Sequence, residues 1–440
     1  MLVRAIRSIM TPASMAAAAM TQAEPDFVLR PSKHLQQDAE MERLAREDWS
    51  YFRLIVAPAA GPRNFVSMGL DPQLSASWHN SKAHEQEGKR RRAWPETWLL
   101  GGSMAALRWA ALCSGGGATD ALQSAFCKMA YKHGDTGETL GAYMQELLGI
   151  AAPDPGKVVH HPSMRLALMV SELKPWCAAI SKLHLQSLFY MLLAANVATP
   201  TAPKLLTRRL CFYTGPAPPS FFDADSQVLC LPLTEANLYQ VLMATTALPF
   251  ISPDCTYIAG LGHGLYCDAA LTDYNLNCVI RDAAWPTLLL SMSCDGGPIL
   301  ANIWDTYVPW RKLPANTWEH VSVLSPTSHY AARLPSSQLP NTWDFFAAQY
   351  IKQPHLRMKA WDAAYELSKL GLACPPVHLL PQPWGQAALR PPAHPAQPSS
   401  RPATSRLPDK LPGTSGTLQG TLQGAGPAGL GSKGGAELCL

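Results

Sequence analysis

A serine at a glycine-rich turn is the best candidate in this 440-residue chain for covalent chemistry. Residues 97–117 read TWLLGGSMAALRWAALCSGGG, in which an apolar run predicts a strand and the following residues predict a helix that a run of glycines ends. Between the two stand Gly101, Gly102 and Ser103. A strand, a tight glycine turn, a serine and a helix form the context of a nucleophile elbow. The start of such a helix places N–H groups and a positive dipole beside the negative charge that develops during attack.

The elbow lacks one glycine of its usual form, which is G-x-S-x-G. Here the pattern continues from Ser103 through Met104 to Ala105, so that alanine stands in the last position. Alanine is the least harmful replacement where a strand and a helix touch. Taken alone, these residues also fit a serine at an ordinary helix N-cap.

Two other segments carry groups that would complete a catalytic site. Residues 56–65, VAPAAGPRNF, predict a second strand that runs into a turn of small residues. Residues 262–274, GHGLYCDAALTDY, place Asp268 after an aromatic strand and before small residues. The chain therefore offers a nucleophile, a turn of backbone N–H groups and a carboxylate.

These three segments resemble the patatin-like phospholipase family, in particular a bacterial-type branch of it. That family has a glycine-rich oxyanion turn, a G-x-S-x-G nucleophile, and a catalytic aspartate in an Asp-Gly-Gly or Asp-Gly-Ala motif. The matching positions are 60–64, Ser103 and 268–270. Further stretches similar to that branch are 232–238, 244–250, 339–345 and 357–361. The order and spacing of all segments agree, and the resemblance spans roughly residues 50–372.

The resemblance implies a serine esterase that hydrolyses lipid acyl esters with a Ser–Asp catalytic dyad. It implies a patatin-like three-layer α/β/α sandwich with a mostly parallel central sheet. Ser103 would attack the ester carbonyl to give an acyl-enzyme, and Asp268 would accept the serine proton without an intervening histidine. A free aspartate has a pKa of about 3.9, so burial would have to raise the pKa of Asp268 to make it a useful base.

The resemblance also implies an oxyanion hole. Its backbone donors would be Gly61, Pro62, Arg63 and Asn64, together with Met104 at the start of the helix. Arg63 stands where the family has a lysine or arginine that orders this loop.

The chain departs from the family pattern at four glycines. Ala60 and Asn64 stand in the oxyanion turn where the family prefers glycine, Ala105 ends the elbow, and Ala269 follows Asp268. Asparagine tolerates left-handed backbone better than most residues. Because these glycine motifs are weakened, a slow or an inactive enzyme remains an alternative.

Two other functions remain as alternatives. One is an α/β-hydrolase with the chain order Ser, Asp, His. The other is a protein of patatin fold that binds lipid or acts as a scaffold without catalysis. The first needs a late histidine, for which the candidates are His263, His320, His329 and His355.

The elements expected around these motifs alternate between strand and helix. Apolar runs predict strands at 53–57, 97–100, 165–170 and 286–292. Helices are predicted at 105–113, 121–131, 181–195 and 235–244. Continuous apolar strands between helices predict an α/β sheet that is covered on both faces.

Composition excludes several other classes of protein. The chain is 47% hydrophobic and 15% charged, with a net charge of +4, so no electrostatic case exists for a nucleic-acid partner. The 11 cysteines contain no Cys-x-x-Cys pair, which favours reduced thiols in an intracellular compartment over disulfides or zinc. His160 and His161 lack other ligands at a suitable spacing, so no metal and no cofactor are expected.

Three regions are expected along the chain. Residues 1–45 form an N-terminal extension, 46–374 the acyl hydrolase domain, and 375–440 a disordered tail with 12 prolines and 10 glycines. The first 23 residues contain arginines and no acid. This pattern fits a transit peptide for chloroplast or mitochondrion, and the alternatives are an untargeted leader in a cytoplasmic protein or a true start at Met15 or Met20.

Two segments are candidates for contact with a membrane. Residues 185–198, LQSLFYMLLAANVA, are too short and too polar for a membrane span, so they predict a buried helix or a lipid-facing helix at the site's mouth. The basic run at 89–92 predicts a solvated loop or a contact with anionic lipid head groups. The partners expected are a lipid ester substrate and, through these segments, a peripheral membrane contact.

Overall fold

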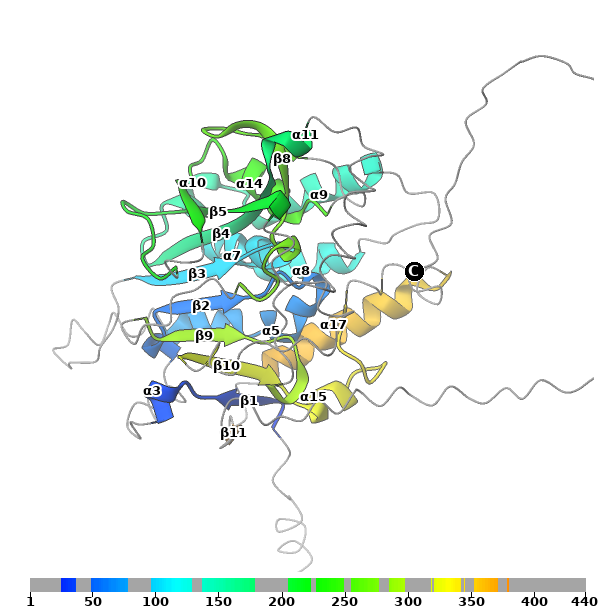
Figure 1. Cartoon of the computed structure of the whole chain (residues 1–440). Coiled ribbons are helices and arrows are strands. Elements are labelled where there is room, and N and C mark those ends of the chain that lie inside the picture. The colour runs from blue at the N-terminus through cyan, green and yellow to red at the C-terminus, as the bar shows by residue number, and fades with distance from the viewer. Residues whose placement is uncertain are drawn as a thin grey trace, which may run out of the picture. The chain divides into compact units, whose positions relative to one another are not determined.

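The computed structural model in Figure 1 describes the chain in sections, and every structural statement below concerns these residues. They are 25–36, 49–77, 96–128, 137–178, 205–222, 227–248, 255–276, 285–296, 318, 320–341, 344, 352–370 and 378–379.

Five parallel strands form the centre of the sheet. In spatial order they are β10 (Val321–Pro326), β9 (Thr287–Leu290), β2 (Leu54–Ala57), β3 (Thr97–Gly101) and β4 (Met164–Leu173). Neighbouring parallel strands need crossover connections. Among the described residues, helices lie along the chain between β2 and β3 and between β3 and β4. The predicted α/β class with a mostly parallel central sheet is therefore confirmed.

Other strands extend both sides of this centre. At one side β1 (Phe27–Arg30) pairs antiparallel with β10, and β11 (His378–Leu379) pairs parallel with β1. At the other side β5 (Thr207–Tyr213) runs antiparallel to β4, and β6 (Val228–Pro232) follows parallel to β5. A hairpin of β7 (Cys255–Ile258) and β8 (Gly262–Asp268) joins the sheet through β4.

The central strands are apolar throughout because both faces of the sheet are buried. In β2, Ile55 and Ala57 belong to the larger hydrophobic cluster on one face, whereas Leu54 and Val56 belong to the cluster on the other. Successive side chains of a strand point to opposite faces, so a strand that is buried on both sides cannot alternate with polar residues.

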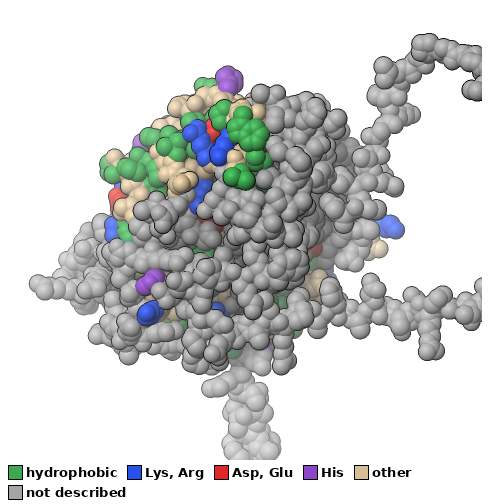
Figure 2. Space-filling model, in the orientation of Figure 1, with side chains coloured by type: hydrophobic (Ala, Val, Ile, Leu, Met, Phe, Trp, Pro, Cys, Tyr) green, Lys and Arg blue, Asp and Glu red, His purple; other side chains and the backbone are tan. Residues whose placement is uncertain are grey.

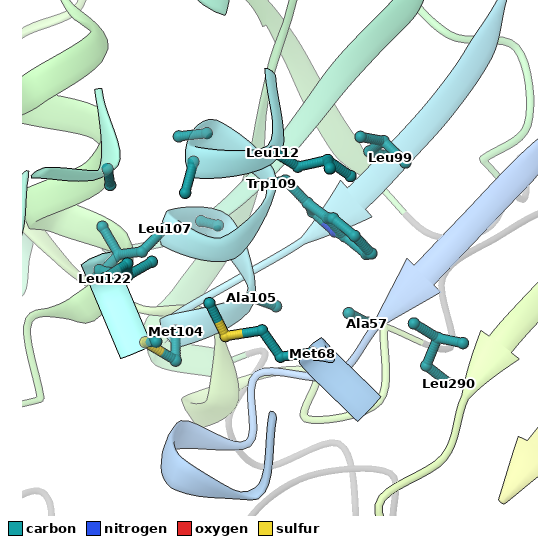
Figure 3. Packing of buried hydrophobic residues seen from close by; sticks show 14 of the residues in the cluster. Ala57, Met68, Leu99, Met104, Ala105, Leu107, Trp109, Leu112, Leu122 and Leu290 are labelled. Carbon is teal, nitrogen blue, oxygen red and sulfur yellow. The ribbon is translucent and has the colours of Figure 1, made fainter. Parts of the chain in front are cut away.

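Helices contribute to the larger of the two clusters. Those that contribute buried residues include α5 (Phe65–Met68), α7 (Met104–Ser114), α8 (Ala118–Lys128), α9 (Gly137–Ala151), α14 (Leu238–Thr246) and α17 (Pro354–Leu370). Figure 3 shows Leu107, Trp109 and Leu112 of α7 packed in this cluster. Short helices complete the described fold: α3 (Lys33–Gln36), α10 (Pro155–Val159), α11 (Pro175–Ala178), α15 (Ser328–Ala332), and the 3-10 turns η1 (Trp49–Tyr51), η2 (Gly61–Asn64), η4 (Ala269–Leu271) and η5 (Cys294–Gly296).

Two strands of the sheet lie outside the predicted domain boundaries at 46 and 374. β1 lies inside the predicted N-terminal extension, where Phe27 and Leu29 are buried and the strand pairs with β10. β11 lies beyond the predicted end and pairs with β1. Short strands such as FVLR carry too few residues for a clear pattern, and their hydrogen-bond partners lie about 300 residues away in sequence, as in the pairing of Val28 with Ser325.

Several predictions fall on residues outside the described set. They are the helix at 181–195, the membrane-contact candidates at 185–198 and 89–92, the transit peptide, and the tail apart from β11. Within the described residues, no helix combines the length and the apolar character needed to cross a membrane.

Candidate active site

The sheet brings the ends of two strands together beside β4. β3 runs parallel to β4 and ends with Gly101 opposite Leu168. β8 runs antiparallel to β4 and ends with Asp268 opposite Val170. Since β5 occupies the other edge of β4, β3 and β8 lie on the same edge and meet there with their carboxyl ends. This topology places the turn after β3 next to Asp268.

Ser103 occupies that turn in a strained conformation. Its φ is 55° and its ψ is −136°, and α7 begins at the next residue. Positive φ is rare for residues other than glycine, and such strain costs of order 1–3 kcal/mol, which the surroundings must offset. The side chain is only 8% exposed. The predicted elbow, with its strand, sharp turn, serine and helix, is therefore present in the structure.

The two glycines before Ser103 allow close approach of other segments. A Cβ on Gly102 would lie 2.8 Å from the Cβ of Ala269 and 3.5 Å from that of Ala59. A Cβ on Gly101 would lie 2.7 Å from the Trp109 ring. Gly102 is required because the oxyanion turn and the aspartate loop converge on it, and Gly101 is required because the Trp109 ring of α7 packs against it.

Asp268 is buried against the serine. Its carboxylate, 1% exposed, accepts hydrogen bonds from the Ser103 hydroxyl and, at 2.8 Å, from the Ala270 N–H. Burial raises the pKa of Asp268 to about 7, although both hydrogen bonds act in the opposite direction. The two residues lie far apart in sequence, so their contact is a property of the fold. Their catalytic roles stay predictions.

The conformation of the oxyanion turn excludes some of the N–H groups that were predicted as donors in the oxyanion hole. Pro62 has no N–H, and the Arg63 N–H already donates to the carbonyl of the residue before the turn, Ala60, at 3.1 Å. Asn64 is the last residue of η2, where a 3-10 helix bonds its N–H to the carbonyl three residues back. Three of the predicted donors therefore do not fit an oxyanion hole.

Two predicted donors remain suitable. Gly61 is the first residue of η2 and Met104 is the first residue of α7. The N–H group at the first position of a helix has no partner within the helix and points outward at the N-terminal end. Gly61 and Met104 are therefore the pair that the geometry retains.

The four departures from the family's glycine pattern lie where the backbone does not require glycine. Ala60 has a φ of −112° and Asn64 a φ of −58°. Ala105 lies in the first turn of α7 and Ala269 in η4. Positive φ in the oxyanion turn occurs at Gly61, where φ is 51°. Asn64 therefore does not need the tolerance of asparagine for left-handed backbone.

Tyr274 connects the oxyanion turn to the aspartate loop. Its carbonyl accepts the Ala59 N–H at 2.9 Å, and its hydroxyl hydrogen-bonds to the side chain of Arg63. Arg63 thus orders the turn through a residue that follows Asp268 by six positions. Sequence reasoning assigned an ordering role to Arg63 and missed Tyr274, which no motif marks.

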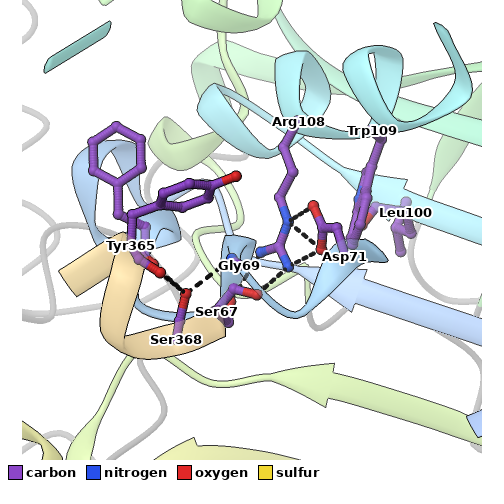
Figure 4. A network of polar contacts seen from close by, with 9 residues as sticks. Ser67, Gly69, Asp71, Leu100, Arg108, Trp109, Tyr365 and Ser368 are labelled. Carbon is purple, nitrogen blue, oxygen red and sulfur yellow. Dashed lines mark hydrogen bonds and ion pairs between the residues drawn. The ribbon is translucent and has the colours of Figure 1, made fainter. Parts of the chain in front are cut away.

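A buried ion pair fixes the elbow helix to the segment after the oxyanion turn. Arg108 of α7 and Asp71 are both fully buried, and Arg108 Nε lies 2.8 Å from Asp71 Oδ2 (Figure 4). The same guanidinium donates to the hydroxyl of Ser67 at 2.9 Å and to its carbonyl at 2.8 Å. This network therefore links α7 to the segment that directly follows the oxyanion turn.

The candidate histidines have other neighbours. His263 is exposed on β8 and packs against Tyr257, and His329 lies 3.4 Å from Asp26. His355 is exposed on α17. Among the described residues, the hydrogen bonds of the Asp268 carboxylate come from Ser103 and Ala270, and neither His320 nor the other three histidines takes part.

Other residues singled out in the sequence have structural partners. His160 lies 3.1 Å from Glu235 at the surface, and His161 Nδ1 accepts backbone N–H groups at 3.2 and 3.0 Å. Asp273 is buried 3.5 Å from Arg209. Within the described part of the chain, no group of His, Cys, Asp and Glu has the arrangement of a metal site.

No protein-family model, curated protein or solved structure matches this chain. Functional inference therefore depends on the geometry of the Ser103 turn and its neighbours and on the sequence motifs themselves.

Proposed function

We propose that this protein is a serine esterase that hydrolyses lipid acyl esters through a Ser103–Asp268 dyad. The observation that carries the proposal is the hydrogen bond from a strained elbow serine to a buried aspartate whose pKa is raised to about 7. We further propose that the fold is a patatin-like three-layer α/β/α sandwich. The proposal draws on the parallel centre of the sheet and on the chain order of oxyanion turn, serine and aspartate.

In the first half of the reaction, Ser103 Oγ attacks the ester carbonyl carbon while its proton passes to the Asp268 carboxylate. The carbonyl oxygen takes up negative charge, which the N–H groups of Gly61 and Met104 stabilise. The protonated Asp268 then gives its proton to the leaving alcohol, and an acyl-enzyme remains on Ser103. Water repeats the sequence, with Asp268 as its base, and releases the fatty acid.

A pKa of about 7 suits both of these roles of Asp268. A carboxyl group of this pKa is ionised in a large fraction of molecules at neutral pH, so it can act as the base. Once protonated, it can also act as the acid that donates the proton to the leaving group. A free aspartate is much too weak a base for a serine hydroxyl. Burial next to Ser103 thus supplies the property that a dyad without histidine needs.

The lipid class of the substrate is inferred from the resemblance and from the surface near β4. Trp176 and Leu205 are 50% and 66% exposed at the end of β4 and the start of β5, beyond Asp268 along the sheet. Figure 2 shows hydrophobic side chains together with Lys and Arg side chains in this part of the molecule. The exposed apolar side chains of this region favour contact with lipid over contact with a small polar ester.

The test of the function is ester hydrolysis by the full-length protein on p-nitrophenyl esters with acyl chains of 4 to 16 carbons. We expect Ser103→Ala and Asp268→Asn to reduce kcat by at least 1,000-fold, as removal of a nucleophile or its base does in other serine hydrolases. Ser114→Ala, which changes a serine at the far end of α7, is the matched control and keeps wild-type activity.

Activity that rises with acyl-chain length supports the lipid class, and a preference for the shortest ester contradicts it. Retained hydrolysis in Ser103→Ala contradicts the function as a whole. A histidine variant as inactive as Asp268→Asn, and folded, would favour a triad instead.

A further inference from the structure

One short segment at the end of α14 contacts the main chain of both dyad residues. The Ser103 N–H donates to Thr245 Oγ1 at 2.8 Å, and the Asp268 N–H donates to the Ala247 carbonyl at 2.9 Å. These acceptors stand two residues apart. A single segment therefore fixes the position of the Ser103 turn relative to the end of β8.

Thr245 has a second, shorter contact that fixes its own hydroxyl. Thr245 Oγ1 donates to the carbonyl of Met169 at 2.6 Å, and the side chain is fully buried. Met169 lies on β4 between Leu168 and Val170, the residues opposite the ends of β3 and β8. The hydroxyl thus links α14, β4 and the elbow at the point where the two catalytic strands meet.

The contact falls on the most strained residue of the site. Ser103 has a φ of 55°, and strain of this kind persists only where the surroundings determine the backbone strongly. Its N–H is buried beneath α14, and a buried N–H without an acceptor is unfavourable. The Thr245 hydroxyl therefore stabilises the one main-chain conformation that aims Ser103 Oγ at Asp268.

We propose that Thr245 is a positioning residue for the dyad, which holds the Ser103 main chain in the reactive conformation through its hydroxyl. The inference rests on the proposed function, because it concerns the reactivity of the same serine. Thr245 acts through Ser103 and makes no contact with substrate. Its loss affects the chemical step and leaves the binding of the ester almost unchanged.

The neighbouring threonine offers a matched control. Thr246 Oγ1 donates to the carbonyls of Leu242 and Met243, both at 3.0 Å, inside its own helix. Replacing Thr246 by valine removes the same atom from the same helix end and leaves the hydrogen bond between Thr245 and Ser103 in place.

The experiment measures kcat and KM for p-nitrophenyl butyrate in Thr245→Val, Thr245→Ser and Thr246→Val, with circular dichroism and the thermal midpoint of each. We expect Thr245→Val to lower kcat by about 10- to 100-fold, because small misplacements of a reacting group have effects of this size. KM changes by less than about twofold. Thr245→Ser restores kcat to within about threefold of wild type, and Thr246→Val leaves it unchanged.

Each outcome decides between the two proposals. Wild-type kcat in folded Thr245→Val, with Ser103→Ala inactive, overturns the positioning role and leaves the function standing. Activity in Ser103→Ala overturns the function itself. If Thr245→Val is unfolded, Thr245→Ala is measured in its place with the same expectation. Unfolding of both, or a rise in KM with kcat unchanged, assigns Thr245 to folding or to binding and overturns the inference.

Discussion

At the scale of single residues, opposing electrostatic effects decide the behaviour of Asp268. Hydrogen bonds from Ser103 and Ala270 stabilise the carboxylate and lower its pKa, whereas removal from water favours the neutral acid and raises it. Burial has the larger effect, and the pKa settles at about 7. A carboxylate in this position needs no histidine to act as a base near neutral pH.

The pH dependence of activity follows from this pKa. Since the base must be ionised, kcat/KM should rise with pH, with a midpoint at about 7 and a plateau above it. The measurement is a kcat/KM profile from pH 4.5 to 9 with a short-chain ester. A midpoint near 4, the value of an exposed aspartate, would mean that Asp268 is not the group that titrates.

The same pKa predicts a cost in stability. The folded pKa of Asp268 lies above its unfolded value of 3.8, so its stabilising contribution is present below pH 3.8 and is lost as pH rises through about 7. Asp268→Asn should therefore be more stable than wild type at pH 8, by about 4 kcal/mol if the shift is about three units. Urea unfolding at pH 8 and pH 4 measures the difference. Equal stability gaps at the two pH values would contradict it.

Residue types and order predicted much of this site, but contacts across the fold did not follow from them. Ser103 and the glycines before it could be identified because a strand, a tight turn and a helix leave a pattern in sequence. The role of Asp268 was implied by the family resemblance. Thr245 bonds through its hydroxyl to the main chain of Ser103 and Met169. Tyr274 bonds to the Ala59 N–H and to the side chain of Arg63, which are also far away in sequence. No spacing or periodicity marks such a contact, since it depends on how β4, β8 and α14 pack.

At the scale of elements, the site depends on how α7 is held. Its N-terminus carries the Met104 N–H, and its buried Arg108 binds Asp71 and Ser67 on the segment that follows the oxyanion turn. The C-terminal part of α17 joins the same assembly, where Ser368 Oγ accepts the Gly69 N–H at 2.9 Å (Figure 4). The helix periodicity of α7 was visible in sequence, but its buried arginine gave no indication of its partner.

Replacing Arg108 alone should destabilise the fold more than replacing both Arg108 and Asp71. Arg108→Leu leaves the Asp71 carboxylate buried without its cation, which costs about 3–5 kcal/mol. Adding Asp71→Asn removes the stranded charge and should recover a large part of that loss. Chemical unfolding of wild type, the single variant and the double variant measures the effect. A double variant no more stable than the single one would show that the pair contributes through packing alone.

At the scale of the whole molecule, alternating strands and helices predicted the fold class because parallel strands buried on both faces must be apolar throughout. The chain ends were harder to place. β1 and β11 are short and lie at one side of the sheet, and each is held there by pairing with residues that are far away in sequence. Composition located the proline- and glycine-rich segment, yet it could not show that His378 and Leu379 add to the sheet.

Two truncations separate these contributions. Residues 390–440 are rich in proline and glycine, and such a composition cannot bury enough apolar surface to offset the entropy of ordering. A chain that ends at Leu389 should therefore keep the wild-type thermal midpoint to within about 2 °C.

A chain that ends at Cys374 also loses β11, which pairs with Val28 and Leu29 of β1. Each lost backbone hydrogen bond contributes about 1 kcal/mol, so its midpoint should fall by about 2–4 °C, as differential scanning calorimetry can resolve. Equal midpoints for the two truncated chains would show that β11 adds nothing to the sheet, and a large fall on removing 390–440 would show that this segment contributes to the fold.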